Sequence, residues 1–131
     1  MSATQITSSS VSAVNEISTG GAVQSFIVDA DGRLSAPIDT IQSEGGNPAF
    51  VVALSTGEVA VVNYGSGNAK IIPTISQGSM FTSSPVITFP VQDGTVSHPH
   101  MALEHKNEVL IPDLVRRLSA IVVFVFLIYL A

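Results

Sequence analysis

Apolar, mostly β-branched residues gather along the chain in short runs that are separated by turn-forming residues. The runs are four to seven residues long and occupy positions 11–15, 22–28, 50–54, 59–63, 69–72 and 85–89. Glycine-containing pairs such as Asp31-Gly32, Thr56-Gly57 and Asp93-Gly94 bound them. Such a pattern is typical of antiparallel sheets built from successive hairpins. No window before residue 114 keeps an i, i+3, i+4 apolar pattern for three helical turns, so the sequence predicts an all-β chain with little helix.

A short motif recurs about every fifty residues. Ala13–Glu16, Val61–Tyr64 and Ile111–Leu114 align with offsets of 48 and 50 residues. A period of this length, with several strands in each repeat, predicts a β-propeller, with a β-sandwich as the alternative. The 131 residues hold two repeats and part of a third, whereas a closed ring needs roughly four to eight. We therefore expect an antiparallel β-propeller fragment of about two blades, whose unpaired blade edges are candidates for self-association.

The C-terminal segment has a different composition. Residues 118–131 carry no charge and directly follow Arg116 and Arg117. As a helix this segment would span about 21 Å, short of a roughly 30 Å hydrocarbon core, and its composition equally allows a buried strand. A membrane anchor, a segment packed on exposed blade surface, and an end produced by an altered reading frame all stay open. The expected division is a polar leader at 1–10, a partial propeller at 11–114 and a divergent apolar tail at 115–131.

Composition and charge exclude several classes of protein. Ten acidic and five basic residues give a net charge of −5, and five scattered cations cannot neutralise a run of phosphates, so nucleic-acid binding is not expected. The absence of cysteine excludes disulfides, thiolate metal sites and a cysteine nucleophile. The polar opening MSATQITSSS lacks the apolar stretch of a secretory signal. We expect a cytoplasmic protein, with membrane association through the tail as the alternative.

Several segments between Val11 and Leu114 carry a family resemblance. They are Ala13–Glu16, Gly21–Phe26, Asp31–Leu34, Gly46–Phe50, Val62-Asn-Tyr-Gly-Ser-Gly67, Ser97-His-Pro-His100 and Val109–Leu114. With these motifs the chain resembles the lactonase family of seven-bladed β-propellers, which includes bacterial 6-phosphogluconolactonases and fungal carboxy-cis,cis-muconate cyclases. The resemblance covers roughly the first third of a full member and stops at Val115, where the family normally has glycine. It implies hydrolysis or formation of a sugar-acid or muconate-type lactone.

The Ser-His-Pro-His motif supplies the candidate catalytic residues, His98 and His100. They flank Pro99, which keeps the triplet extended, so both side chains project to the same side. The resemblance implies that the motif enters an inner strand and that one histidine faces the lactone, where a neutral imidazole can polarise a carbonyl or relay a proton. Capping of backbone carbonyls is the alternative. Because no further histidine or carboxylate lies at metal-ligand spacing, we expect no metal and no other cofactor.

Polar residues at the ends of the repeated motif are the candidate substrate-binding residues. Asn63 and Tyr64 lead into a glycine turn that needs positive φ. Glu16 and Asp113 hold the equivalent places in the first and third repeats. We expect Glu16, Asn63 and Tyr64 to line a channel mouth that binds a small anionic or hydroxylated ligand, with turn capping as the alternative.

The resemblance implies that the substrate-gripping arginines and an acidic residue come from later blades, which this sequence does not contain. We therefore expect a lactone-acting parent activity to which this chain contributes one wall of the site, with the 131-residue chain inactive alone. The alternative is a non-catalytic propeller fragment or interaction module, associated with membranes through residues 118–131.

Overall fold

The computed structural model describes residues 9–90, 94–117 and 120–130. The regular secondary structure in these ranges consists of β-strands, without a helix. The strands are β1 (Ser9–Asn15), β2 (Ala22–Val28), β3 (Asp39–Gln42), β4 (Pro48–Ala53), β5 (Val59–Asn63), β6 (Asn68–Ile72), β7 (Thr74–Ile75), β8 (Met80–Phe81), β9 (Ile87–Thr88), β10 (Leu103–His105), β11 (Glu108–Arg117) and β12 (Ala120–Tyr129). Each of the six apolar runs overlaps one of these strands, which confirms the all-β prediction.

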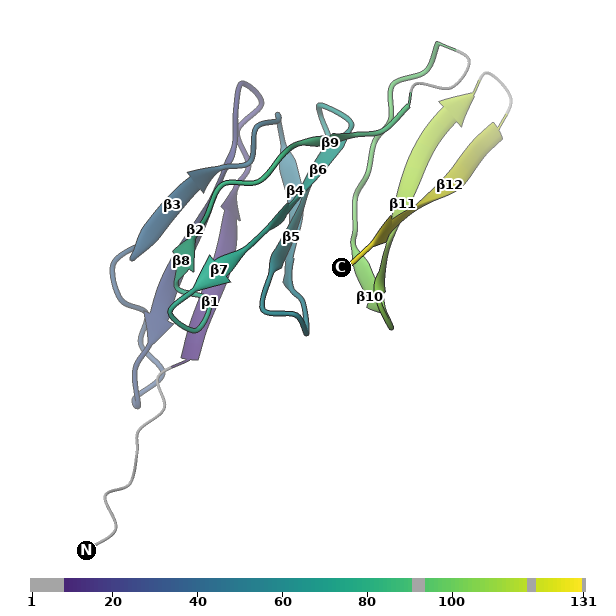
Figure 1. The fold of residues 1–131 in the computed structure, drawn as a ribbon. Coiled ribbons are helices and arrows are strands. Elements are labelled where there is room, and N and C mark those ends of the chain that lie inside the picture. The colour runs from purple at the N-terminus through teal and green to yellow at the C-terminus, as the bar shows by residue number, and fades with distance from the viewer. Residues whose placement is uncertain (1–8, 91–93, 118–119, 131) are drawn as a thin grey trace, which may run out of the picture.

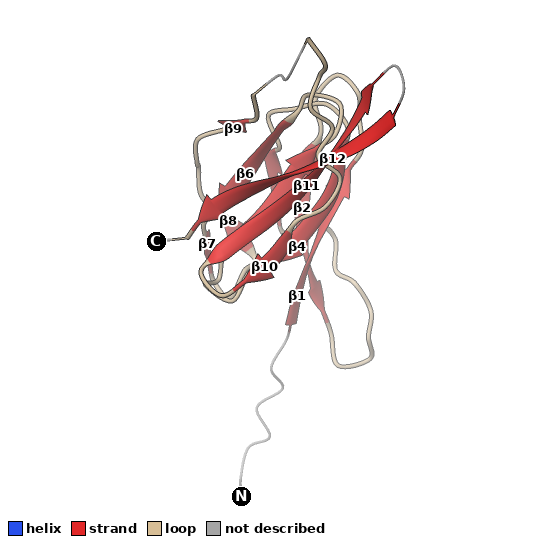
Figure 2. Ribbon diagram, turned by 90° about the vertical axis from the view of Figure 1, so that its right-hand side faces the viewer, coloured by secondary structure: helices blue, strands red, loops and turns tan. Residues whose placement is uncertain are grey.

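The strands form three larger antiparallel sheets that lie side by side (Figure 1). Sheet 1 has the order β1-β2-β3, sheet 2 the order β4-β5-β6-β9, and sheet 3 the order β10-β11-β12. A short hairpin, β7-β8, sits beside sheet 1. Figure 2 shows the strands from the side, where those of the three sheets overlap in successive layers. This series of similar sheets agrees with the propeller prediction and not with a two-sheet sandwich.

Sheet 2 is buried on both faces because it lies between the other two. Along β5, Val59 and Val61 pack toward sheet 1 with Val23 of β2, whereas Ala60 and Val62 pack toward sheet 3. All five residues of β5 are buried. A strand alternates its side chains between faces, so a strand covered on both sides reads as a continuous apolar run. Full burial of each valine stabilises the fold by about 1.5–3 kcal/mol.

The repeated motif occupies the same kind of strand in each sheet. Its copies end β1 and β5 at Asn15 and Asn63 and lie within β11. In sheets 2 and 3 an edge strand, β4 or β10, precedes the motif strand, whereas β1 is itself at the edge of sheet 1. The inner strand of a blade is an edge strand of its sheet. Asn63 ends β5, which lies between β4 and β6 and is therefore not an edge strand.

The C-terminal segment forms a strand. β12 pairs with β11 over ten positions, from Glu108 opposite Tyr129 to Arg117 opposite Ala120. Pairing thus continues across residue 115, where the motifs quoted from the sequence stop, and the apolar segment extends sheet 3. Within the described ranges no helix is long and apolar enough to cross a membrane.

Candidate functional site

The loops at one end of the three sheets are joined to one another by hydrogen bonds to backbone carbonyl oxygens. The Asn47 N–H donates to the Ile17 carbonyl at 2.9 Å, which connects the β1–β2 loop to the entrance of β4. The Tyr64 N–H donates to the Asn47 carbonyl at 2.9 Å, which adds the β5–β6 turn. His98 Nδ1 lies 3.0 Å from the Tyr64 carbonyl oxygen and adds the segment before β10. Residues far apart in sequence therefore meet along this end, where β1 and β5 terminate (Figure 1).

Tyr64, His98 and His100 form an aromatic cluster at this end. The His98 ring stacks on the Tyr64 ring with centroids 4.6 Å apart and planes 23° apart. The His100 ring meets the Tyr64 ring edge-on, at 5.6 Å and 85°. Tyr64 and His98 are half-buried and His100 is exposed. Both histidine rings thus contact the same Tyr64 ring, as expected for side chains that project to the same side of an extended segment.

The carboxylate of Asp113 holds the backbone of the histidine motif. It is 2% exposed, and its two oxygens accept the Ser97 hydroxyl at 2.9 Å and the His98 backbone N–H. Pro99 forms a β-bridge with Asp113, and the Leu114 N–H donates to the His98 carbonyl at 3.2 Å. The motif therefore runs alongside β11 as an extension of the sheet edge. Asp113 caps this segment, as the turn-capping alternative predicted.

A close approach of the β5–β6 turn fixes the position of Ser97. Gly67 has φ +64°, and a Cβ atom at this position would lie 2.8 Å from the Ser97 carbonyl oxygen. The Gly67 N–H donates to the Asn63 carbonyl at 3.0 Å and closes the turn. Only glycine satisfies both the left-handed backbone and this contact without displacement.

Asn63 is fully buried below the loops. Its Nδ2 donates to the Ser43 carbonyl at 2.9 Å and to Asn68 Oδ1 at 2.7 Å. A Cβ atom at Gly45 would lie 2.5 Å from Asn63 Nδ2, so this loop passes directly over the amide. Asn63 thus ties the connection between sheets 1 and 2 to β5. This geometry matches capping and leaves the side chain without direct access to solvent.

Glu16 is exposed in the loop that follows β1. In the described structure this loop reaches the cluster through the Ile17 carbonyl and Asn47, not through the Glu16 side chain. The repeat alignment places Glu16 opposite Tyr64, and Asn15 opposite Asn63. Of the five sequence-predicted site residues, the structure therefore brings three together: Tyr64, His98 and His100.

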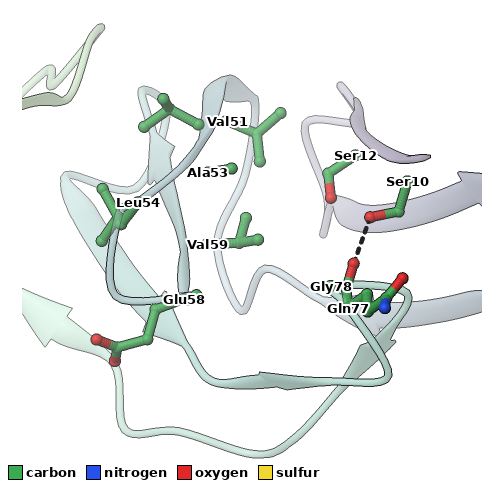
Figure 3. Close-up of a pocket in the computed structure, with 11 residues that line it drawn as sticks. Ser10, Ser12, Val51, Ala53, Leu54, Glu58, Val59, Gln77 and Gly78 are labelled. Carbon is green, nitrogen blue, oxygen red and sulfur yellow. Dashed lines mark hydrogen bonds between the residues drawn. The ribbon is translucent and has the colours of Figure 1, made fainter. Parts of the chain in front are cut away.

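A cavity of about 210 Å³ lies at the opposite end of β1 and β5 (Figure 3). Ser10 and Ser12 line one side, the β4–β5 hairpin lines another, and the β7–β8 turn closes it through Gln77 and Gly78. The Ser10 hydroxyl donates to the Gln77 carbonyl at 2.8 Å across its mouth. None of the sequence-predicted site residues lines this cavity.

Comparison with known proteins identifies the family. The family described as "Lactonase, 7-bladed beta-propeller" matches residues 3–116. The chain belongs to this lactonase family. A crystal structure of a putative 6-phosphogluconolactonase from Bacteroides fragilis is similar to it, with 26% sequence identity and a TM-score of 0.69. That similarity covers 79% of this chain and 31% of the other, so the chain spans about a third of the length of this relative. No curated protein matches the chain.

Sequence reasoning missed how the lactonase-family motifs depend on one another. It treated Asp113 as a channel-mouth residue and did not identify Ser97 or Asn47 as the residues that link the loops. The available signal was the presence of Ser97 within the histidine motif and of Asn47 between Gly46 and Pro48. The partner of Ser97 is 16 positions away and those of Asn47 are 17 and 30 positions away, and no local pattern reveals such pairs.

Proposed function

We propose that this chain forms part of a lactone-acting propeller and supplies one wall of its substrate site. Its candidate catalytic residues are His98 and His100, and the proposed substrate is a sugar-acid lactone such as 6-phosphogluconolactone, with a muconate-type lactone as the alternative. The observation that carries the proposal is the cluster of Tyr64, His98 and His100 at the loop end of the sheets. Membership of the lactonase family and the similarity to a putative 6-phosphogluconolactonase support it.

The cluster fits the chemistry of lactone opening. A water molecule must lose a proton as it bonds to the lactone carbonyl carbon, and the ring oxygen must gain one as it leaves. A positioned imidazole performs both transfers near neutral pH. In this proposal the exposed His100 donates a hydrogen bond to a substrate oxygen, and the Tyr64 ring contacts both histidine rings.

Glu16 and Asn63 have supporting parts in this proposal. Glu16 is exposed on a loop joined to the cluster, so it is free to bind a hydroxyl group of the substrate. Asn63 is buried and acts through the loop at Ser43–Gly46, whose position it fixes. Ligand-binding experiments test these two proposed roles.

We further propose that the isolated 131-residue chain is inactive. Opening a lactone requires groups that reach the carbonyl from several directions at once. The described part of this chain provides the cluster on one side only. Purified chain should therefore hydrolyse 6-phosphogluconolactone no faster than buffer does. A clear rate that His98→Ala or His100→Ala removes would contradict the inactivity and support the site.

Binding of the stable product, 6-phosphogluconate, tests the site without requiring turnover. We expect titration of isotope-labelled chain to move the ring signals of His98 and His100. His105, exposed at the far end of β10, provides an internal control and should not respond. Equal movement of all three histidines, or none at high millimolar concentration, would overturn the proposed function.

The position of β1 favours a second candidate function, a non-catalytic interaction module that self-associates through sheet edges. Among the described residues β1 lies at the edge of sheet 1, and the backbone groups of an edge strand are a template for another strand. Membrane association through residues 118–131 and a cytoplasmic location stay expectations from the sequence. Flotation with lipid vesicles, compared with a chain lacking these residues, tests the former.

A further inference from the structure

The two histidines of the cluster differ in how their rings are held. His98 Nδ1 lies 3.0 Å from the Tyr64 carbonyl oxygen. A carbonyl oxygen only accepts hydrogen bonds, so Nδ1 must carry the hydrogen of this pair. In the neutral ring the second nitrogen, Nε2, then holds the lone pair. The contact thereby selects one of two tautomers and leaves Nε2 as an acceptor.

The plane and the backbone of His98 are fixed as well. The Tyr64 ring stacks on it at 4.6 Å, and Asp113 accepts the His98 backbone N–H. The Leu114 N–H donates to the His98 carbonyl at 3.2 Å. The Asp113 carboxylate is 2% exposed and also holds the neighbouring Ser97 hydroxyl, so bulk water does not compete for these contacts. Every polar backbone group of His98 therefore has a partner.

His100 lacks comparable restraints. It is exposed, touches Tyr64 only by an edge, and its backbone N–H meets the Pro112 carbonyl at a long 3.4 Å. Within the described part of the chain no hydrogen bond reaches its ring nitrogens. The ring of His100 is therefore free to take either tautomer, whereas the ring of His98 is not.

We infer that His98, through Nε2, is the proton acceptor of the site, and that Asp113 is a positioning residue that acts through the His98 backbone. The acceptor role rests on the proposed lactone-opening function. In that reaction a water proton moves to Nε2 as the water oxygen bonds to the carbonyl carbon. The carbonyl carbon–ring oxygen bond then breaks, and the ring oxygen takes the proton back from Nε2. One lactone and one water give one hydroxy acid, and the Tyr64 carbonyl stabilises the transient imidazolium through Nδ1–H.

The tautomer is directly measurable on the 131-residue chain. We propose a long-range ¹H–¹⁵N correlation on chain labelled at histidine, recorded at alkaline pH where imidazole rings are neutral. The expected result is a protonated Nδ1 and an unprotonated Nε2 at His98, with averaged signals at the solvent-exposed His105. A His98 ring protonated at Nε2 would overturn the inference.

Matched variants test the positioning role. Tyr64→Phe keeps both the carbonyl and the stacked ring, so the His98 tautomer should not change. Asp113→Asn replaces one carboxylate oxygen with an amide group and should turn the single His98 tautomer into a mixture. Should Asp113→Asn fail to fold, Ser97→Ala removes one contact of the same carboxylate and should shift the tautomer in the same direction. An unchanged tautomer in the folded variant would overturn the role of Asp113.

These measurements separate the inference from the proposed function. A single Nδ1–H tautomer together with no response to 6-phosphogluconate would overturn the lactone site, and with it the acceptor role, while the restraint on the ring stands. A ligand response together with an Nε2–H tautomer would support the site and overturn the assignment of His98 as acceptor.

Discussion

Glu104 on β10 accepts two hydrogen bonds from Ser55, in the turn that joins β4 and β5. The Ser55 N–H lies 2.9 Å from Glu104 Oε2, and the Ser55 hydroxyl lies 2.5 Å from Oε1. These contacts join sheets 2 and 3 at the end opposite the aromatic cluster. Hydrogen bonds from the Ser55 hydroxyl and backbone N–H lower the pKa of Glu104, and they outweigh the smaller opposite effect of desolvation.

The Glu104 contact predicts a small pH dependence of stability. Because the pKa is lower in the folded chain than in the unfolded chain, ionised Glu104 stabilises the fold above its unfolded pKa. This contribution is lost as the pH falls through the folded pKa. Glu104→Gln should therefore lower the denaturation midpoint slightly at pH 7 and leave it unchanged at pH 2. Exposed Glu16→Gln is the control, and an equal effect of both changes would contradict the prediction.

Burial of sheet 2 on both faces predicts that neighbouring residues of β5 are equally sensitive. Val61 and Val62 are both fully buried, yet they point toward different sheets. Val61→Ala and Val62→Ala should each lower the free energy of unfolding by about 1–3 kcal/mol, since each leaves a cavity. Urea denaturation measures these changes.

The control for this pair is Val11→Ala on the edge strand β1. Val11 is 41% exposed, so its truncation should change the free energy of unfolding by less than about 0.5 kcal/mol. A large effect at only one of the two β5 positions would indicate that sheet 2 is covered on one face alone, as in a sandwich.

Alanine substitutions at Gly67 and Gly57 distinguish the effect of backbone strain from the effect of a close contact. Both have positive φ, but a Cβ atom at Gly57 meets nothing within 4 Å, whereas one at Gly67 lies 2.8 Å from the Ser97 carbonyl. Gly57→Ala should cost about 1 kcal/mol through strain alone. Gly67→Ala should cost more and should also move the ring signals of His98, because Ser97 must shift. Unchanged His98 signals in a folded Gly67→Ala chain would show that the turn does not position the histidine motif.

Much of the fold was predictable from the sequence because apolar runs directly report buried strands. The run at 22–28 coincides with β2, and the run at 59–63 coincides with β5. β3 (Asp39–Gln42) and β10 (Leu103–His105) were missed because edge strands bury few side chains and read as polar segments. The expectation for 118–131 left strand and helix open, because composition without alternation favours neither.

The candidate site was predictable only in part. The spacing of His98 and His100 predicted that both side chains project to the same side, because side chains alternate along an extended segment. The roles of Asn63 and Asp113 were not predictable, because a strand-end polar residue looks the same whether it faces a ligand or caps a loop. The deciding contacts, to Ser43 and Ser97, join residues that are 20 and 16 positions apart.

The position of β1 at the edge of sheet 1, among the described residues, predicts self-association that depends on concentration. The exposed and half-buried residues of β1 alternate, and Val11 is among those exposed. A charge on an edge strand opposes pairing with another strand, so Val11→Lys should weaken the association measured by sedimentation. Leu34→Lys makes the same change on a 59% exposed residue outside the strands and is the matched control. Of these two residues, only Val11 lies on the edge strand. Equal weakening by both variants would therefore assign the association to general surface hydrophobicity. A monomer at all concentrations would show that this edge does not pair.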